Sequence, residues 1–110
     1  MKYIKMAADV GTTSPESPDK DKEILEIFAD GRNRIFTVRL QNSSVLTKHK
    51  ANGPIVVQCL SGRGTFYAGP ELEESAELRQ GTLLTLGPDI AHEVAAEDEL
   101  YILVTKFQQV

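Results

Sequence analysis

The sequence has few of the residues that would link a chain covalently or carry it through a membrane. Among 110 residues there is one cysteine, Cys59, so no disulfide can form within the chain. Its longest purely apolar runs are a few residues long, whereas a membrane-spanning helix needs about 20. The N-terminal stretch also lacks an apolar segment of the length that a secretory signal requires. These absences predict a cytoplasmic protein, in keeping with a reducing compartment.

Positive charge is also in short supply. Twelve lysines and arginines stand against sixteen aspartates and glutamates, which gives a formal net charge of −4. Proteins that bind nucleic acid owe most of their affinity to neutralised phosphates, and no basic stripe is present here. The composition therefore predicts neither nucleic acid nor a membrane as a partner.

Helical periodicity is missing as well, and short strands take its place. Residues 7–23 are polar and contain Pro15 and Pro18, which is typical of a linker or arm. From there the chain alternates between apolar and polar residues in short runs, with glycine and proline between them. Asp30-Gly31 separates two such runs and predicts a hairpin. We expect one all-β domain over residues 24–110, preceded by an N-terminal arm over residues 1–23.

Inside that arm, "KYIKM" favours a short strand that crosses to a partner subunit. A second feature also predicts a partner. In "PIVVQCL" the residues that alternate outward, Val56, Gln58 and Leu60, are too apolar to face water. A second subunit or the N-terminal arm would cover them. We expect a homodimer that pairs edge strands and covers the outer face of residues 55–60.

Only two histidines occur, His49 and His92, and each falls on an alternating stretch. In "VLTKHKA" the face of His49 also carries Val45, Thr47 and Ala51. In "HEVAAE" the glutamates at 93 and 97 must face water, which turns His92, Val94 and Ala96 inward. The same interior receives alternate residues of "PIVVQCL". We thus predict a ligand pocket lined by His49, His92, Thr47, Ala51, Ile55, Val57, Cys59 and Val94, of a kind that holds a small molecule.

From these residues the chain resembles the cupin superfamily of jelly-roll (double-stranded β-helix) barrels, over residues 43–107. Its first motif is glycine, five residues, His-x-His, three or four residues, glutamate, six residues, glycine. Here His49 and Gly62 match it, while Ser43, Ala51 and Ile55 replace the opening glycine, the second histidine and the glutamate.

The second motif is glycine, five residues, Pro-x-Gly, two residues, histidine, three residues, asparagine. Gly81 and His92 match it. Gly87 takes the proline position, and Asp89 and Ala96 replace the second glycine and the asparagine. Two of the four ligand positions that the family uses for metal therefore remain, His49 and His92.

The resemblance implies a divalent metal such as zinc, iron, nickel or copper as cofactor, held by His49 and His92. The loss of the other ligands, and of the glutamate's negative charge, instead favours no tightly bound metal. Two main functions stay open. One is a small-molecule-binding module with a degenerate two-histidine metal site, and the other is a metal-dependent oxygenase or isomerase of a small organic substrate. A structural or regulatory interaction protein is the third. Buried histidines hydrogen-bonded to each other, to threonine or to water would account for the pair without any metal. Cys59 suits a buried hydrophobic role.

Overall fold

The computed structural model describes residues 2–7 and 21–107, and every regular element in them is a β-strand. No helix among these residues is long and apolar enough to cross a membrane. The all-β prediction is therefore confirmed. The strands are β1 (Lys22–Ala29), β2 (Asn33–Leu40), β3 (Val45–His49), β4 (Ile55–Ala68), β5 (Glu74–Arg79), β6 (Leu83–Leu86) and β7 (His92–Phe107).

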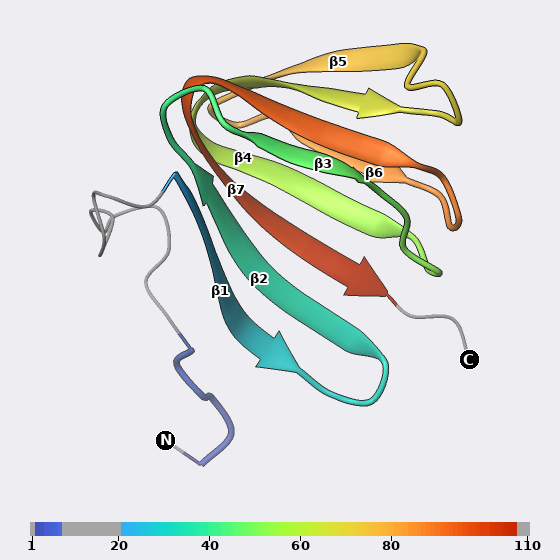
Figure 1. The fold of residues 1–110 in the computed structure, drawn as a ribbon. Helices are drawn as coiled ribbons and strands as arrows, with labels where there is room; N and C mark the ends of the chain where they lie inside the picture. The colour runs from blue at the N-terminus through green and yellow to red at the C-terminus, as the bar shows by residue number, and fades with distance from the viewer. Residues whose placement is uncertain (1, 8–20, 108–110) are drawn as a thin grey trace.

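Two long strands, β4 and β7, organise the sheet by pairing with each other in antiparallel register. The first half of β4 also pairs with β6 and its second half with β5. Likewise, the first half of β7 pairs with β3 and its second half with β2. Because both long strands bend, the sheet folds over itself, with β5 in one layer and β1 and β2 in the other (Figure 1). This arrangement is a jelly roll, as predicted.

The roll is not closed by hydrogen bonds. The strand order is β1-β2-β7-β4-β5, with β3 added to β7 and β6 added to β4. Among the described strands β1 therefore has β2 as its one neighbour and β5 has β4. The cavity that the sequence predicts inside a barrel thus lies between two layers that remain open at their edges.

The bend of the long strands occurs at a glycine. The pairing of β4 with β7 shifts register between Cys59 and Ser61 and again between Gly62 and Gly64. Gly62 has φ of +82°, and a Cβ there would lie 2.2 Å from the carbonyl oxygen of Glu99. Bulges and glycines let a strand turn sharply while its partner stays close. Gly62 thus allows one strand to serve both layers.

The turn geometry agrees with the two motifs of the resemblance. At the four positions where those motifs have glycine, this chain has Ser43, Gly62, Gly81 and Asp89, with φ of 56°, 82°, 92° and 59°. All four backbones are left-handed, a conformation that non-glycine residues adopt at a cost. The substitutions at 43 and 89 therefore changed the side chain without changing the turn.

The hairpin expected at Asp30-Gly31 is confirmed, since β1 and β2 pair antiparallel on either side of it. The Asp30 carboxylate accepts hydrogen bonds from the backbone N–H groups of Arg32 at 2.8 Å and Asn33 at 2.7 Å. These two bonds lower the pKa of the Asp30 carboxyl. The Asp30 side chain thus holds the turn, and Gly31 is not among the glycines with positive φ.

The apolar core fills the space between the layers next to the bend. Its most deeply buried side chains are Val38, Leu40, Val57, Cys59, Leu78, Leu100 and Ile102. Residues of β2 and β7 that face the interior pair in register, and the pairs follow one another from the bend toward the open end. They are Leu40 with Leu100, Val38 with Ile102, Phe36 with Val104, and Arg34 with Lys106. The interior therefore changes from aliphatic at the bend to cationic at the open end.

The N-terminal arm is described over residues 2–7, which form no strand within the single chain and leave Tyr3, Ile4 and Met6 exposed. The "KYIKM" strand that crosses to a partner subunit stays a prediction. Most of the arm, residues 8–20, lies outside the described residues. The predicted boundary at residue 23 falls one residue inside β1, which begins at Lys22.

Replacing Gly62 by alanine is expected to lower the free energy of unfolding by about 2 kcal/mol or more, because the strained backbone and the Cβ contact act together. Gly31→Ala is the matched control, since a Cβ at Gly31 meets nothing within 4 Å. Urea unfolding of both variants measures the difference. Equal stability of the two variants would contradict the role given to Gly62.

Candidate functional site

A β-bulge in β3 places His49 on the inner side of the sheet. Leu46 pairs with Val94 and His49 pairs with His92, so three steps along β3 match two along β7. The bulge leaves the backbone N–H of Lys48 without a strand partner, and the Glu93 carboxylate accepts its hydrogen bond at 3.1 Å. The extra residue brings both Leu46 and His49 onto the face of His92.

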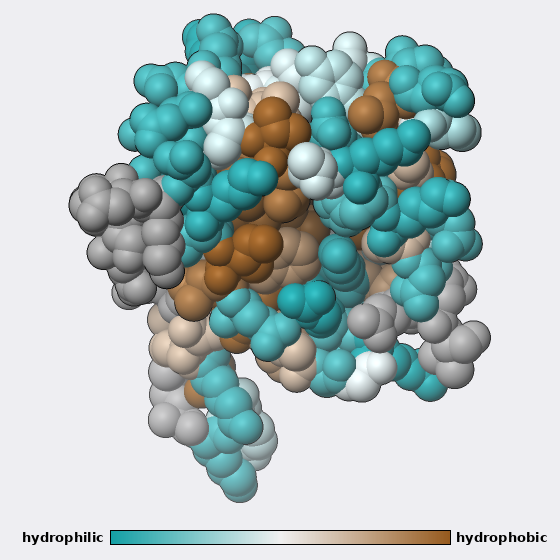
Figure 2. Space-filling model, in the orientation of Figure 1, coloured by the Kyte–Doolittle hydropathy of each residue, from teal (hydrophilic) through white to brown (hydrophobic). Residues whose placement is uncertain are grey.

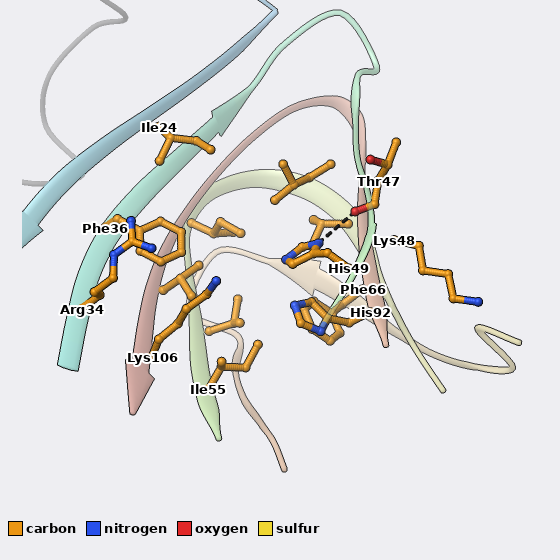
Figure 3. A pocket seen from close by; sticks show the side chains of 15 residues that line it. Ile24, Arg34, Phe36, Thr47, Lys48, His49, Ile55, Phe66, His92 and Lys106 are labelled. Atoms are coloured by element: carbon orange, nitrogen blue, oxygen red, sulfur yellow. Dashed lines mark hydrogen bonds between the residues drawn. The ribbon is translucent and has the colours of Figure 1, made fainter. Parts of the chain in front are cut away.

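This bulge corrects the predicted faces of β3. Strict alternation put Val45 and Thr47 inward with His49 and Leu46 outward. In the structure Leu46 lines the interior and Val45 pairs with Ala95 on the outward side. Thr47 borders the cavity, but its hydroxyl points away from the two imidazoles (Figure 3). The alternation of β7 holds, since His92, Val94 and Ala96 are all buried.

The two imidazoles meet directly across β3 and β7. Their ring centroids are 4.2 Å apart and the rings are inclined by 62°. His49 Nδ1 lies 2.8 Å from the carbonyl oxygen of Thr47, and His92 Nδ1 lies 3.0 Å from that of Ile90. A carbonyl oxygen can only accept, so each Nδ1 carries the proton and donates. A neutral imidazole bonded in this way keeps an Nε2 lone pair for a ligand.

His92 is the more enclosed of the pair. Its side chain is buried, and Phe66 stacks against it with centroids 5.6 Å apart and rings inclined by 12°. Burial lowers the pKa of His92, and the bond to the Ile90 carbonyl opposes that shift. The electrostatic effects of the neighbouring His49 and Lys106 side chains lower it further. His92 is therefore neutral at pH 7 and acts as a hydrogen-bond acceptor or a nitrogen ligand.

The imidazoles form one end of a cavity of about 360 Å³. Figure 2 shows apolar surface within a hollow that has a polar rim. Arg34, Phe36 and Lys106 lie at the opposite end from the two histidines (Figure 3). The cavity is lined by Ile24, Arg34, Phe36, Leu46, Thr47, Lys48, His49, Ile55, Val57, Phe66, His92, Val94, Ile102, Val104 and Lys106. Its volume lies in the range typical of small-molecule sites.

Most of the residues predicted for the pocket come together here, and two do not. Those that line the cavity are His49, His92, Thr47, Ile55, Val57 and Val94. Cys59 points inward but lies in the solid core beside the bend, where its thiol donates to the Ser61 carbonyl at 3.5 Å. Burial raises the pKa of that thiol. Ala51 lies beyond the end of β3, packs against the core, and accepts a hydrogen bond from Asp89 through its carbonyl.

Several cavity residues were not predicted from the sequence. Most of them lie at the end that carries Arg34 and Lys106, or on β1 and β2. They include Ile24, Arg34, Phe36, Leu46, Phe66, Ile102, Val104 and Lys106. A signal for several of them was present, because alternation from Val38 extends to Phe36 and Arg34, and alternation from Ile102 extends to Val104 and Lys106. Leu46 had no such signal, since its placement depends on the bulge.

As a metal centre the site is incomplete in its donor set. His49 and His92 supply two nitrogen ligands, whereas catalytic metal sites normally use three protein ligands and an open position. Ala51 and Ile55, at the other two positions of the family pattern, carry no donor atom. No cluster of three or more His, Cys, Asp or Glu side chains suited to a metal occurs within residues 2–7 and 21–107. The two histidines could therefore supply only part of the ligand set of a catalytic metal centre.

Comparison with known proteins places the fold. No family model and no curated protein matches the sequence. Among solved structures, a cupin superfamily protein from Desulfitobacterium hafniense is 12% identical, with 86% of this chain and 84% of that chain covered and a TM-score of 0.79. An RmlC-like cupin protein from Desulfovibrio desulfuricans is 18% identical, with 94% and 97% covered and a TM-score of 0.79.

A third structural neighbour is an enzyme, salicylate 1,2-dioxygenase from Pseudoaminobacter salicylatoxidans. It is 14% identical and has a TM-score of 0.70, with 84% of this chain but 28% of that chain covered. At these identities the likeness establishes the fold alone. The two-layered sheet, the left-handed turns at the motif positions and these neighbours together show that the chain has the fold of the cupin superfamily.

Proposed function

We propose that this protein binds a small organic molecule in the cavity between its two layers. The observation that carries the proposal is the cavity itself, with about 360 Å³ of space lined by aliphatic and aromatic side chains and by two imidazoles at one end. An open cavity of this size with a mostly apolar lining and a few polar groups is typical of small-molecule sites. The core beside it is tightly buried, which makes a general packing defect a poor explanation.

In this function the histidines act as acceptors. Each Nδ1 is committed to a backbone carbonyl, so each Nε2 is free to accept a hydrogen bond from a hydroxyl or N–H group of the ligand. The two carbonyl bonds fix the rings before the ligand arrives, which reduces the entropy lost on binding. Phe66 adds a flat apolar surface against His92.

The alternative is a metal-dependent enzyme, an oxygenase or isomerase of a small organic substrate. The observation that favours it is the pair of Nδ1–carbonyl bonds, because metal-ligating histidines commonly donate their other nitrogen to such a group. The dioxygenase among the structural neighbours is consistent with it. The shortage of a third protein ligand favours the binding module instead.

Binding can be detected with a tryptophan reporter, because the chain contains no tryptophan. Ile24 lines the cavity and Leu25 is the next residue, with exposures of 55% and 49%. Cyclohexylmethanol is expected to shift the emission of Ile24→Trp saturably and to leave that of Leu25→Trp unchanged. Amide spectra of the wild type would locate the same contacts. If neither spectrum changes up to the solubility limit, the cavity does not take this neutral probe, which counts against the proposal and in favour of an interaction protein.

Metal content separates the two functions. The binding module predicts substoichiometric metal in protein purified without added ions, and a folded His49→Ala variant. The enzyme predicts one metal per chain that is lost in both His49→Ala and His92→Ala but retained in Lys50→Ala, an adjacent exposed control. Elemental analysis of the four proteins, with circular dichroism as the folding check, measures this. Stoichiometric metal lost in both histidine variants would reverse our preference.

A second copy of the chain is the proposed protein partner. On the outer sheet face Leu25, Thr37, Leu103, Gln58 and Leu83 form one row in register across five strands. Leu83 is 64% exposed and Leu25 is 49% exposed. A row with three leucines, ending at the exposed edge strand β1, suits a two-fold contact between sheets.

Light scattering during gel filtration tests this assembly. The wild type is expected to elute at twice the chain mass. Leu83→Lys is expected to elute as a monomer, because the contact would bury its charge without a partner. Gln80→Lys, an exposed position outside the row, serves as the control. A wild type that remains at the mass of one chain at high concentration would refute the dimer.

A further inference from the structure

Two cations face each other at the open end of the cavity. Arg34 on β2 and Lys106 on β7 are direct partners across the strand pair, and both line the cavity. Both approach the Phe36 ring, at 5.1 Å for the guanidinium and 5.4 Å for the ammonium. In Figure 3 the Lys106 ammonium reaches toward the space between Phe36 and the histidines. Arg34 and Lys106 form the last inward-facing pair along β2 and β7, in the series that begins with Leu40 and Leu100.

This arrangement is unfavourable for an empty protein. Like charges directly opposite each other across two strands destabilise a sheet. Lys106 is also half-buried, and burial together with the charge of Arg34 lowers its pKa. An uncharged side chain such as methionine would cover the same apolar surface without either cost. The cost therefore calls for a compensating role.

The protein balances one of the two charges. Arg34 Nε donates to Glu26 Oε1 on the edge strand β1 at 3.0 Å. Lys106, within the described part of the chain, has no carboxylate or hydrogen-bond acceptor in contact, and its neighbour is the face of Phe36. Among the described residues, two cations and one carboxylate leave one positive charge without a counter-charge. Cations held away from bulk water are normally paired, which points to a negative group supplied from outside.

The rest of the cavity limits what that group is attached to. Between the cations and the histidines the walls are apolar, formed by Phe36, Ile102 and Val104 from β2 and β7 and by Ile55 and Val57 from β4. An inorganic anion would leave this surface unfilled. A polyanion such as a nucleotide would bring more charge than one unpaired lysine balances. The lining suits one anionic group joined to an apolar body.

We propose that the ligand is a small organic monocarboxylate, whose carboxylate lies between Lys106 and Arg34 and whose apolar body extends toward His49 and His92. This inference rests on the proposed function, because it assigns the ligand class of the same cavity. A planar carboxylate accepts charge-assisted hydrogen bonds from an ammonium and a guanidinium together. The imidazole Nε2 atoms then meet the far end of the ligand, where they select for a hydroxyl or N–H group.

A matched pair of probes tests the ligand class: cyclohexanecarboxylate and cyclohexylmethanol, which share the ring and differ in charge. Titrations of the wild type followed by amide spectra at pH 7.5 give both dissociation constants. We expect the carboxylate to bind at least about tenfold more tightly, as a charge-assisted contact in a half-buried site implies. Added salt should weaken the carboxylate and leave the alcohol unchanged.

Variants assign that preference to the lysine. Lys106→Met is expected to reduce the preference to within about twofold while the alcohol still binds, and Lys106→Arg is expected to restore it. Lys22→Met, at an exposed lysine outside the lining, is the matched control and should keep the wild-type preference. Relief of the charge repulsion should also make ligand-free Lys106→Met at least as stable as the wild type, which a purely structural lysine would not do.

The possible results distinguish the ligand class from the binding function of the cavity. Equal affinities for acid and alcohol in the wild type would overturn the ligand class and leave the cavity's function standing. A carboxylate preference that survives in Lys106→Met would also overturn it, because the charge would then act elsewhere. Binding of neither probe would contradict the proposed function itself, and the inference with it.

Discussion

The pairing of β4 with β7 is the constraint on which the rest of the structure depends. Each strand is long enough to belong to both layers, and each remains bonded to the other on both sides of the bend. The shorter strands attach to these two, so neither layer exists without them. Gly62 makes the arrangement possible because no side chain stands between its backbone and that of Glu99. A Cβ at Gly64 would likewise lie 2.4 Å from the carbonyl oxygen of Ala95, so two glycines of β4 allow the close approach of β7 at the bend.

Within that frame the interior is graded in polarity. Beside the bend the inward residues are aliphatic and fully packed, then come aromatic and imidazole rings around open space, and finally the cations. Register alone produces this order, since every second residue of β2 and β7 contributes to it. The same strands present a leucine-rich outer row. A single sheet therefore carries a cavity on one side and a surface suited to assembly on the other.

The sequence was sufficient for the fold because its signals are local and repeated. Alternation, the Asp30-Gly31 turn and the spacing from Gly81 to His92 each reflect a backbone requirement that one short stretch satisfies. Much of the cavity lining could be predicted for the same reason, since alternation on β4 and β7 fixes which residues face inward. The two histidines were also expected to share an interior, and they lie in contact.

The features that could not be predicted depend on a β-bulge, which breaks the alternation, and on how far each inward side chain lies from the open end of the cavity. The bulge before His49 reverses the predicted faces of Val45 and Leu46, and the alternating pattern of β3 does not indicate it. Cys59 faces inward as expected, but alternation does not say that the interior beside the bend is solid. Lys106 was not expected in the cavity lining because lysine side chains usually face water. The alternation of β7 nevertheless places this residue on the inward face.

Edge strand β1 contributes both to the entrance of the cavity and to the balance of charge beside it. It is bonded to β2 alone among the described strands. It supplies Ile24 to the cavity lining and Glu26 to the ion pair with Arg34. The position of one edge strand therefore sets both the width of the entrance and the charge that an incoming anion meets there.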